Sequence, residues 1–139
     1  MNILFFLTPK SEVAVVEEND TLRQVLEKME HHGYAAVPLI TKDEKYVGTI
    51  TEGDVLRKLH RDDFPSLKQM EDIPVMDVIR RRDNRPVHIS TDMEGLVDRA
   101  LNQNFVPVVD DDSVFIGIVT RKDLIQYLRG QCRRYENTL

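Results

Sequence analysis

Gly117-Ile118-Val119-Thr120-Arg121-Lys122-Asp123 is the stretch that decides the fold of this chain. Its β-branched residues indicate a buried strand. Thr120 followed three residues later by Asp123 is typical of a helix N-cap, and the amphipathic run that begins at Leu124 indicates that the helix continues. The sequence therefore predicts a strand that leads directly into the start of a helix.

The same stretch is a candidate phosphate site. The first turn of a helix presents unpaired backbone N–H groups and the positive end of the helix dipole, and both favour an anion. The Thr120 hydroxyl can add a hydrogen bond, and Arg121 and Lys122 add two positive charges. Asp123 can accept a hydrogen bond from a vicinal diol such as a ribose. A Thr-x-x-Asp pattern is equally typical of an ordinary helix cap, so the motif alone does not identify a ligand.

An earlier stretch, Gly48-Thr49-Ile50-Thr51-Glu52-Gly53-Asp54, repeats the pattern. The first glycine, the last threonine and the aspartate of the two stretches are each 69 residues apart, and so are Pro38 and Pro107. Before the two prolines, the spacing between corresponding residues of the two repeats becomes 71, so Gly33 corresponds to Asn104. Both are residue types that can end a helix in the left-handed conformation. Repetition of this kind predicts two similar structural units.

The hydrophobic periodicity gives each repeat the order strand, helix, strand, strand, helix. The first repeat is predicted to have a strand at 13–16, a helix capped at Asp20 or Thr21 and running to about His32, strands at 36–40 and 46–50, and a helix from Thr51 to about Leu59. The second is predicted to have a strand at 87–89, a helix capped by Thr91, a hairpin of 106–109 with 114–119, and a last helix from Asp123 to about Arg129. Between them, apolar residues in 60–74 suggest a short docked helix.

Two copies of this order, each with a Val-Pro strand and a Gly-h-h-Thr-x-x-Asp stretch (h, hydrophobic), resemble a tandem cystathionine-β-synthase (CBS) domain pair, or Bateman module. The resemblance extends from about Leu7 to Leu128. It implies an α/β (α+β) fold of two β-α-β-β-α repeats related by a pseudo-twofold axis. The implied units are repeat 1 at 7–60, a connector at 61–74, repeat 2 at 75–129 and a frayed tail at 130–139. It also implies that the apolar lead-in at 1–9 packs onto the second repeat.

In this family the ligands bind in two clefts between the repeats. The resemblance implies that one cleft is formed by these ligand-binding residues: Ala14, Tyr34, Ala35, Ala36, Thr120, Arg121, Lys122 and Asp123. The small alanines leave room for a flat base, and Tyr34 can stack on it. The alternative for Tyr34 is an ordinary half-buried aromatic at the edge of a strand.

The resemblance implies a second cleft built on the first motif, with these residues: Thr51, Asp54, Arg85, His88, Phe105 and Val106. Glu52 would oppose a phosphate there, where the other cleft has a cation. The arginines at 80–82 and Arg85 either compensate for that charge or form a solvated basic turn. We therefore expect the cleft at Thr120 to be the tighter phosphate site.

The function implied by the resemblance is regulatory: the protein binds an adenine nucleotide between its repeats and signals to a separate, unknown target protein. Cyclic-di-AMP is favoured over AMP, ADP or ATP, because the segments around Tyr34 and Phe105 and the basic pair after Thr120 look like stand-alone CBS proteins that bind cyclic-di-AMP. S-adenosylmethionine or no ligand are further alternatives. A structural or protein-interaction module with vestigial clefts is the alternative class. The apolar positions on the final helix of each repeat predict a homodimer.

The net charge, the cysteine count and the length of the apolar runs disfavour several other classes of protein. The formal net charge of −5 disfavours binding to nucleic acid or to an anionic membrane. The single cysteine, Cys132, cannot form an intrachain disulfide and suits a reducing cytoplasm. The apolar run 3–7 is too short for a signal peptide or a membrane span. The acidic run 110–112 is predicted to be a hairpin turn, and the sequence holds no recognisable catalytic or metal-binding set. We therefore expect no enzyme activity, cofactor or metal.

Overall fold

The computed structural model describes residues 2–138. Its first part has these elements in chain order: η1 (Ile3–Phe6), β1 (Thr8–Pro9), η2 (Lys10–Glu12), β2 (Val16–Glu17), α1 (Leu22–His32), β3 (Ala36–Ile40), β4 (Tyr46–Thr51) and α2 (Glu52–Arg61). The second part continues with α3 (Leu67–Met70), η3 (Val75–Asp77), β5 (Val87–His88), α4 (Met93–Ala100), β6 (Phe105–Val109), β7 (Phe115–Thr120) and α5 (Arg121–Thr138). The predicted order of strands and helices is thus present twice.

The two sheets have matching topology. One sheet has the order β2-β3-β4, and the other has the order β1-β7-β6-β5. In each repeat a short strand runs parallel to the first strand of an antiparallel hairpin. The hairpin registers also match, because Ala36 lies opposite Thr51 and, 69 residues on, Phe105 lies opposite Thr120. The internal repeat predicted from spacing is therefore a structural repeat, and the predicted mixed α/β fold is confirmed.

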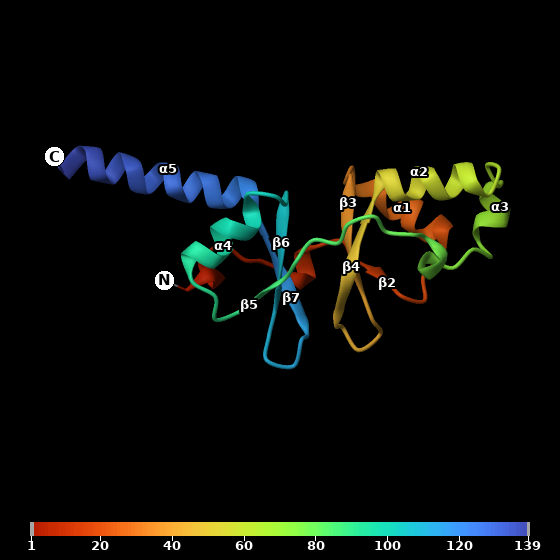
Figure 1. The fold of residues 1–139 in the computed structure, drawn as a ribbon, viewed down its shortest axis with the longest axis horizontal. Coiled ribbons are helices and arrows are strands. Elements are labelled where there is room, and N and C mark those ends of the chain that lie inside the picture. Colours follow the sequence, from red (N-terminus) through yellow and green to blue (C-terminus); the bar gives the residue numbers. More distant parts are fainter. Residues whose placement is uncertain (1, 139) are drawn as a thin grey trace.

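Each repeat buries its own hydrophobic core between its sheet and its helices. The sheets occupy the middle of the molecule, with α1, α2 and α3 on one outer side and α4 and α5 on the other (Figure 1). The first core contains the buried residues Val16, Leu22, Val25, Met29, Val37, Leu39, Ile50, Val55, Met70, Val75 and Val78. The second contains Ile3, Phe6, Val87, Leu96, Ala100, Val106, Val108, Val119 and Leu124.

The N-terminal lead-in belongs to the second repeat, as expected. Ile3 and Phe6 lie in the second core, and β1 pairs antiparallel with β7, with Pro9 opposite Gly117. A Cβ atom at Gly117 would lie 2.2 Å from the carbonyl oxygen of Thr8, and the φ of Gly117 is +154°. Glycine is therefore required at this point of the repeated motif, because only glycine admits the strand from the other end of the chain.

Three predicted boundaries are wrong. The strand predicted at 13–16 is limited to Val16–Glu17, because residues 10–12 form a 3₁₀ turn and only 16 and 17 pair with β3. Asp92 rather than Thr91 caps α4, since the Asp92 carboxylate accepts from the Gly95 N–H at 2.8 Å. Asn104 is not a left-handed cap, because α4 ends at Ala100 with a right-handed residue at 101, whereas Gly33 does end α1 with φ +68°.

The last helix is also longer than predicted. It continues past Gly130 to Thr138 and projects from the body of the molecule (Figure 1). A glycine inside a helix costs about 1 kcal/mol relative to alanine, and the strong helix formers on both sides of it compensate. Within residues 2–138 no helix is long and apolar enough to cross a membrane.

Candidate functional site

A cleft of about 310 Å³ lies between the two repeats. It is lined by Thr8, Glu12, Val13, Ala14, Tyr34, Ala35, Ala36, Pro38, Asn104, Phe105, Ile118 and Thr120. Five of the residues predicted for the cleft at the second motif are among them: Ala14, Tyr34, Ala35, Ala36 and Thr120. The structure thus brings residues far apart in the sequence to one concave site of the size that small ligands occupy.

The alternation of strand residues explains how the cleft is built. On β3, Ala36 and Pro38 line the cleft, while Val37 between them is fully buried in the first core. On β7, Ile118 and Thr120 line it in the same way. Successive side chains of a strand point to opposite faces, so each hairpin serves the core with one face and the cleft with the other. Pro38 and Ile118 were not predicted as site residues, although this period of two could have identified them.

The start of α5 forms one end of the cleft. The Thr120 hydroxyl accepts from the Asp123 N–H at 3.1 Å, as the capping pattern predicts. The Arg121 side chain donates through Nε to the carbonyl oxygen of Ala100 at 2.8 Å, at the end of α4. Arg121, Lys122 and Asp123 are not among the residues that line the cleft. Arg121 instead satisfies a carbonyl that a helix C-terminus leaves unpaired.

Tyr34 and Glu12 line the side of the cleft opposite the start of α5. Tyr34 is 42% exposed, and its ring lies parallel to the His32 ring with centroids 5.5 Å apart. A partly exposed aromatic ring that lines a cleft beside two alanines is suited to stacking on a flat ring. The exposed Glu12 also lines the cleft and adds a negative charge that opposes a phosphate.

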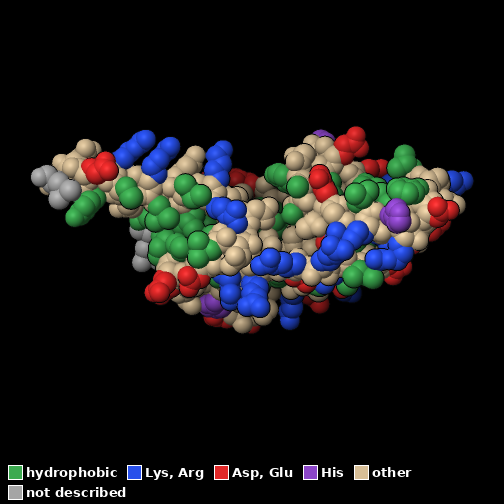
Figure 2. All heavy atoms as spheres, turned by 45° about the horizontal axis from the view of Figure 1, so that its top comes forward, with side chains coloured by type: hydrophobic (Ala, Val, Ile, Leu, Met, Phe, Trp, Pro, Cys, Tyr) green, Lys and Arg blue, Asp and Glu red, His purple; other side chains and the backbone are tan. Residues whose placement is uncertain are grey.

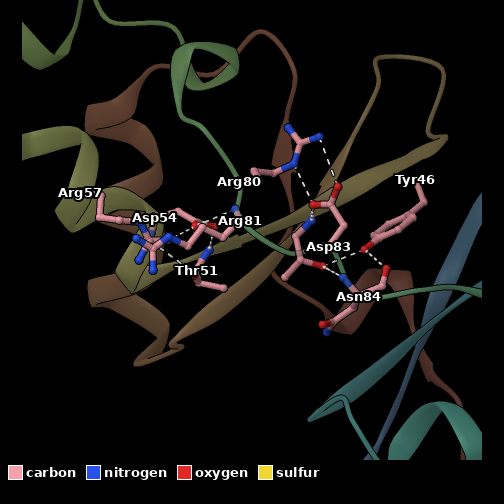
Figure 3. Close-up of polar contacts among 9 residues, drawn as sticks. Tyr46, Thr51, Asp54, Arg57, Arg80, Arg81, Asp83 and Asn84 are labelled. Carbon is pink, nitrogen blue, oxygen red and sulfur yellow. Dashed lines mark hydrogen bonds and ion pairs between the residues drawn. The ribbon is translucent and has the colours of Figure 1, made fainter. Parts of the chain in front are cut away.

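The first motif has different surroundings, because residues 80–85 of the second repeat, which connect η3 to β5 and are called the connecting segment below, lie directly on it (Figure 3). The Asp83 carboxylate accepts from the Thr49 N–H at 2.9 Å and from Arg80 Nε at 2.8 Å. A Cβ atom at Gly48 would lie 2.2 Å from that carboxylate. Gly117 and Ile118, 69 residues on from Gly48 and Thr49, lie beside β1, and a Cβ atom at Gly117 would meet the carbonyl oxygen of Thr8 at the same 2.2 Å. Asp83 therefore takes the place beside β4 that β1 takes beside β7.

A chain of hydrogen bonds holds this segment in place. Tyr46 donates its hydroxyl to the carbonyl oxygen of Asn84 at 2.6 Å and lies 2.7 Å from the Thr49 hydroxyl. The Asn84 side chain also donates to the carbonyl oxygen of Phe105 at 3.2 Å, which ties the segment to the second repeat. Burial raises the pKa of Tyr46 to about 12, so the hydroxyl keeps its proton and remains a donor at neutral pH.

Asp54 of the first motif is 2% exposed and its carboxylate is fully engaged within the protein. It accepts from the Thr51 N–H at 3.2 Å, from the Arg81 N–H at 3.2 Å, and from the Arg57 guanidinium (Figure 3). A carboxylate with these three partners has little capacity left for a ligand hydroxyl.

Of the residues predicted for the second cleft, only Thr51 contacts Asp54. Arg85 lines a separate polar cavity, and His88 bonds with Ser90 and Asp111. Phe105 lines the cleft described above, while Val106 is fully buried in the second core. The structure therefore does not bring the six predicted residues together. The segment at 80–84 lies between Thr51 and Asp54 on one side and the predicted residues of the second repeat on the other.

Comparison with known proteins identifies the family. The profile of the CBS domain matches the chain twice, over residues 6–61 and 75–130. The chain belongs to the CBS domain family and contains two CBS domains in tandem, as the sequence predicts.

Three similar proteins are named with the nucleotides that they bind. Cyclic di-AMP receptor B of Bacillus subtilis is 28% identical over 133 residues, covering 92% of this chain and 86% of that protein. The crystal structure of CbpB in complex with c-di-AMP superimposes with a TM-score of 0.88 at 22% identity, covering 100% of this chain and 91% of that one. CBSX2 in complex with AMP gives a TM-score of 0.73 at 23% identity, covering 93% and 96%.

Other relatives are longer than this chain. It spans 58% of an uncharacterised protein of Methanopyrus kandleri and 21% of the inosine-5'-monophosphate dehydrogenase of Methanocaldococcus jannaschii, each at 27% identity. The likeness to the dehydrogenase therefore concerns only a minor part of that enzyme.

Proposed function

We propose that this protein is a regulatory CBS pair that binds an adenine nucleotide in the cleft between β3 and β7 and passes its occupancy to a partner protein. The observation that carries the proposal is the lining of that cleft, in which Ala35 and Ala36 leave space beside the exposed ring of Tyr34 and the capping hydroxyl of Thr120. Such a site offers a flat slot, a stacking surface and a helix start in one place.

The preferred ligand is cyclic-di-AMP, with AMP, ADP or ATP as the alternative. The Bacillus relative named as a cyclic-di-AMP receptor supports the first, and the AMP complex of CBSX2 supports the second. Charge favours the cyclic ligand: each of its phosphodiesters carries a single negative charge, whereas a terminal phosphate carries about −1.5 to −2 at pH 7. Glu12 at the cleft opposes the denser charge more strongly.

Calorimetric titration of the purified protein with cyclic-di-AMP, AMP, ADP and ATP at one salt concentration tests this assignment. We expect heat of binding from cyclic-di-AMP at micromolar concentration and weaker binding of the others. If AMP or ATP binds at micromolar concentration while cyclic-di-AMP gives no heat and displaces neither, the preference is wrong. If no nucleotide raises the melting temperature, the alternative of an interaction module with vestigial clefts is favoured.

We expect Tyr34→Ala to weaken nucleotide binding by roughly tenfold to a hundredfold, because stacking of a base on an aromatic ring contributes about 1–3 kcal/mol. Tyr135→Ala is the matched control, since Tyr135 is 66% exposed on the projecting end of α5, far along the chain from the cleft. Calorimetry on both variants measures the difference. Equal affinities for the two variants would show that the Tyr34 ring does not contact the base.

Signalling is expected to proceed by population shift, in which the nucleotide binds one arrangement of the repeats, or of a dimer, better than another. A homodimer is part of this proposal. The outer faces of α2 and α5 expose Leu56 (61%), Ile125 (55%) and Leu128 (38%), which neither core requires. Ile125 and Leu128 lie about one turn apart on α5, and exposed apolar patches on helices commonly mark a protein–protein interface.

Light scattering after size exclusion should therefore give twice the mass of one chain, and Leu56→Glu should shift the protein toward the monomer. A charge buried in an apolar interface without a partner is strongly unfavourable. Leu101→Glu is the control, because Leu101 is 71% exposed but lies at the end of α4, off the α2 and α5 faces. A monomer at tens of micromolar for the unmodified protein would reject the dimer.

A further inference from the structure

A second cavity, of about 320 Å³, lies between the connecting segment at 82–85 and the end of α4. Every residue that lines it is charged or carries a side-chain amide. Three of them are arginines: Arg82, Arg85 and Arg99. Within residues 2–138, none of these three guanidinium groups forms an ion pair or a side-chain hydrogen bond. Three unpaired arginines around one cavity form an unusual concentration of positive charge in a chain whose net charge is −5.

We propose that this cavity is a second binding site, separate from the cleft between the repeats, and that it takes a phosphate-bearing anion such as a pyrophosphate group. Guanidinium groups present planar pairs of N–H donors that match phosphate oxygens, and these charge-assisted hydrogen bonds are about twice as strong as neutral ones. The Tyr34–Thr120 cleft differs in chemistry, because its lining is mostly apolar.

The balance of charge in the cavity favours an anion. Two carboxylates also line it, Asp83 and Asp98. Asp83 is already paired with Arg80 at 2.8 Å, so its charge is compensated within the connecting segment. Asp98 alone opposes an anion directly, against three arginines. Figure 2 shows Lys and Arg side chains gathered along the waist of the molecule, between its two halves.

The backbone of Arg85 is held in place by the side chain of Gln103, which is 7% exposed. The Gln103 carbonyl oxygen accepts from the Arg85 N–H at 2.7 Å, and its amide donates to the Arg85 carbonyl oxygen at 3.0 Å. This pair of hydrogen bonds fixes the backbone of Arg85 against the end of α4.

The position of Arg99 offsets the main electrostatic cost of the site. The C-terminal end of a helix carries a partial negative charge that disfavours an anion. Arg99 lies in the last turn of α4 and places a full positive charge at that end. A third cavity, of about 310 Å³ and also polar, lies along α4 beside Thr91, and Asp98 and Arg99 line this cavity as well.

Pyrophosphate titrated calorimetrically into the whole protein tests the proposal. We expect one pyrophosphate per chain, with affinity that falls as salt is added. Arg99→Gln should weaken it by at least tenfold. Arg133→Gln, which removes the same charge from an exposed position on α5, should leave it unchanged within a factor of two.

A third variant separates this site from the proposed nucleotide cleft. Thr120→Val alters the Tyr34–Thr120 cleft and should not change the affinity for pyrophosphate. Loss of pyrophosphate binding in Thr120→Val would place the anion in that cleft and overturn the proposal. Absence of heat at millimolar pyrophosphate, or equal weakening by Arg99→Gln and Arg133→Gln, would overturn it as well.

Discussion

Replacing Asp54 by alanine should lower the free energy of unfolding by about 3 kcal/mol, a large share of the 5–15 kcal/mol that stabilises a typical domain. The Asp54 carboxylate is 2% exposed and accepts hydrogen bonds from two backbone N–H groups and from the Arg57 guanidinium. Alanine leaves these donors in a partly buried place without an acceptor, and each unsatisfied donor costs about 1–3 kcal/mol. The loss would include one anchor of the connecting segment, because one of those N–H groups belongs to Arg81.

Asp123→Ala is the matched control, because Asp123 holds the equivalent position in the second motif. Its carboxylate forms no hydrogen bond or ion pair within residues 2–138, and the cap on α5 uses the backbone N–H of Asp123, which alanine retains. We expect this variant to lose less than about 1 kcal/mol. Denaturant unfolding followed by circular dichroism measures both variants. Losses of similar size would mean that the Arg57 and Arg81 contacts do not stabilise the fold.

This contrast shows what the sequence could and could not predict. The fold follows from local signals, of which two occur in both repeats: the capping pattern at Thr51 and Thr120, and the Val-Pro hairpins. The helix end at Gly33 is a further local signal, present in the first repeat only. The position of five cleft residues was implied by the resemblance to CBS pairs, in which one repeat faces the helix start of the other, and these five residues do line the cleft between β3 and β7. The helices and strands depend on neighbours in the chain, so their spacing identifies them, whereas the cleft depends on how the repeats pack and was predicted only through the family resemblance.

The differences between the repeats could not be predicted in the same way. The threonine and aspartate of the capping pattern are the same in both repeats, but Asp83 and Asn84 of the connecting segment bond to the first motif only. Likewise, Arg121 looks like a phosphate ligand from its place after Thr120, whereas in the structure its side chain satisfies a carbonyl oxygen of α4. Both contacts depend on where irregular segments lie in the tertiary structure. A short sequence motif does not contain that information.

The strongest expected effect on ligand binding comes from Ala36→Phe, which should weaken nucleotide binding more than a hundredfold. Ala36 lies on β3 with its side chain toward the cleft, so a phenyl ring there would occupy the space assigned to the base. The change copies the second repeat, where Phe105 holds the equivalent position opposite Thr120. A hundredfold loss of affinity corresponds to about 2.7 kcal/mol of binding free energy. A side chain that fills the space of the base completely should cost at least that much.

The fold should tolerate this substitution, because the neighbouring Val37 and Leu39 supply the core contacts of β3 on its other face. Ala36→Ser serves as the control at the same position, since it adds a single oxygen atom and leaves the slot open; its affinity should stay within about threefold of the unmodified protein. Calorimetry with cyclic-di-AMP gives the affinities, and thermal unfolding without ligand verifies that both variants are folded. If folded Ala36→Phe still binds the nucleotide as the unmodified protein does, the base does not lie between β3 and β7, and the proposed binding site is wrong.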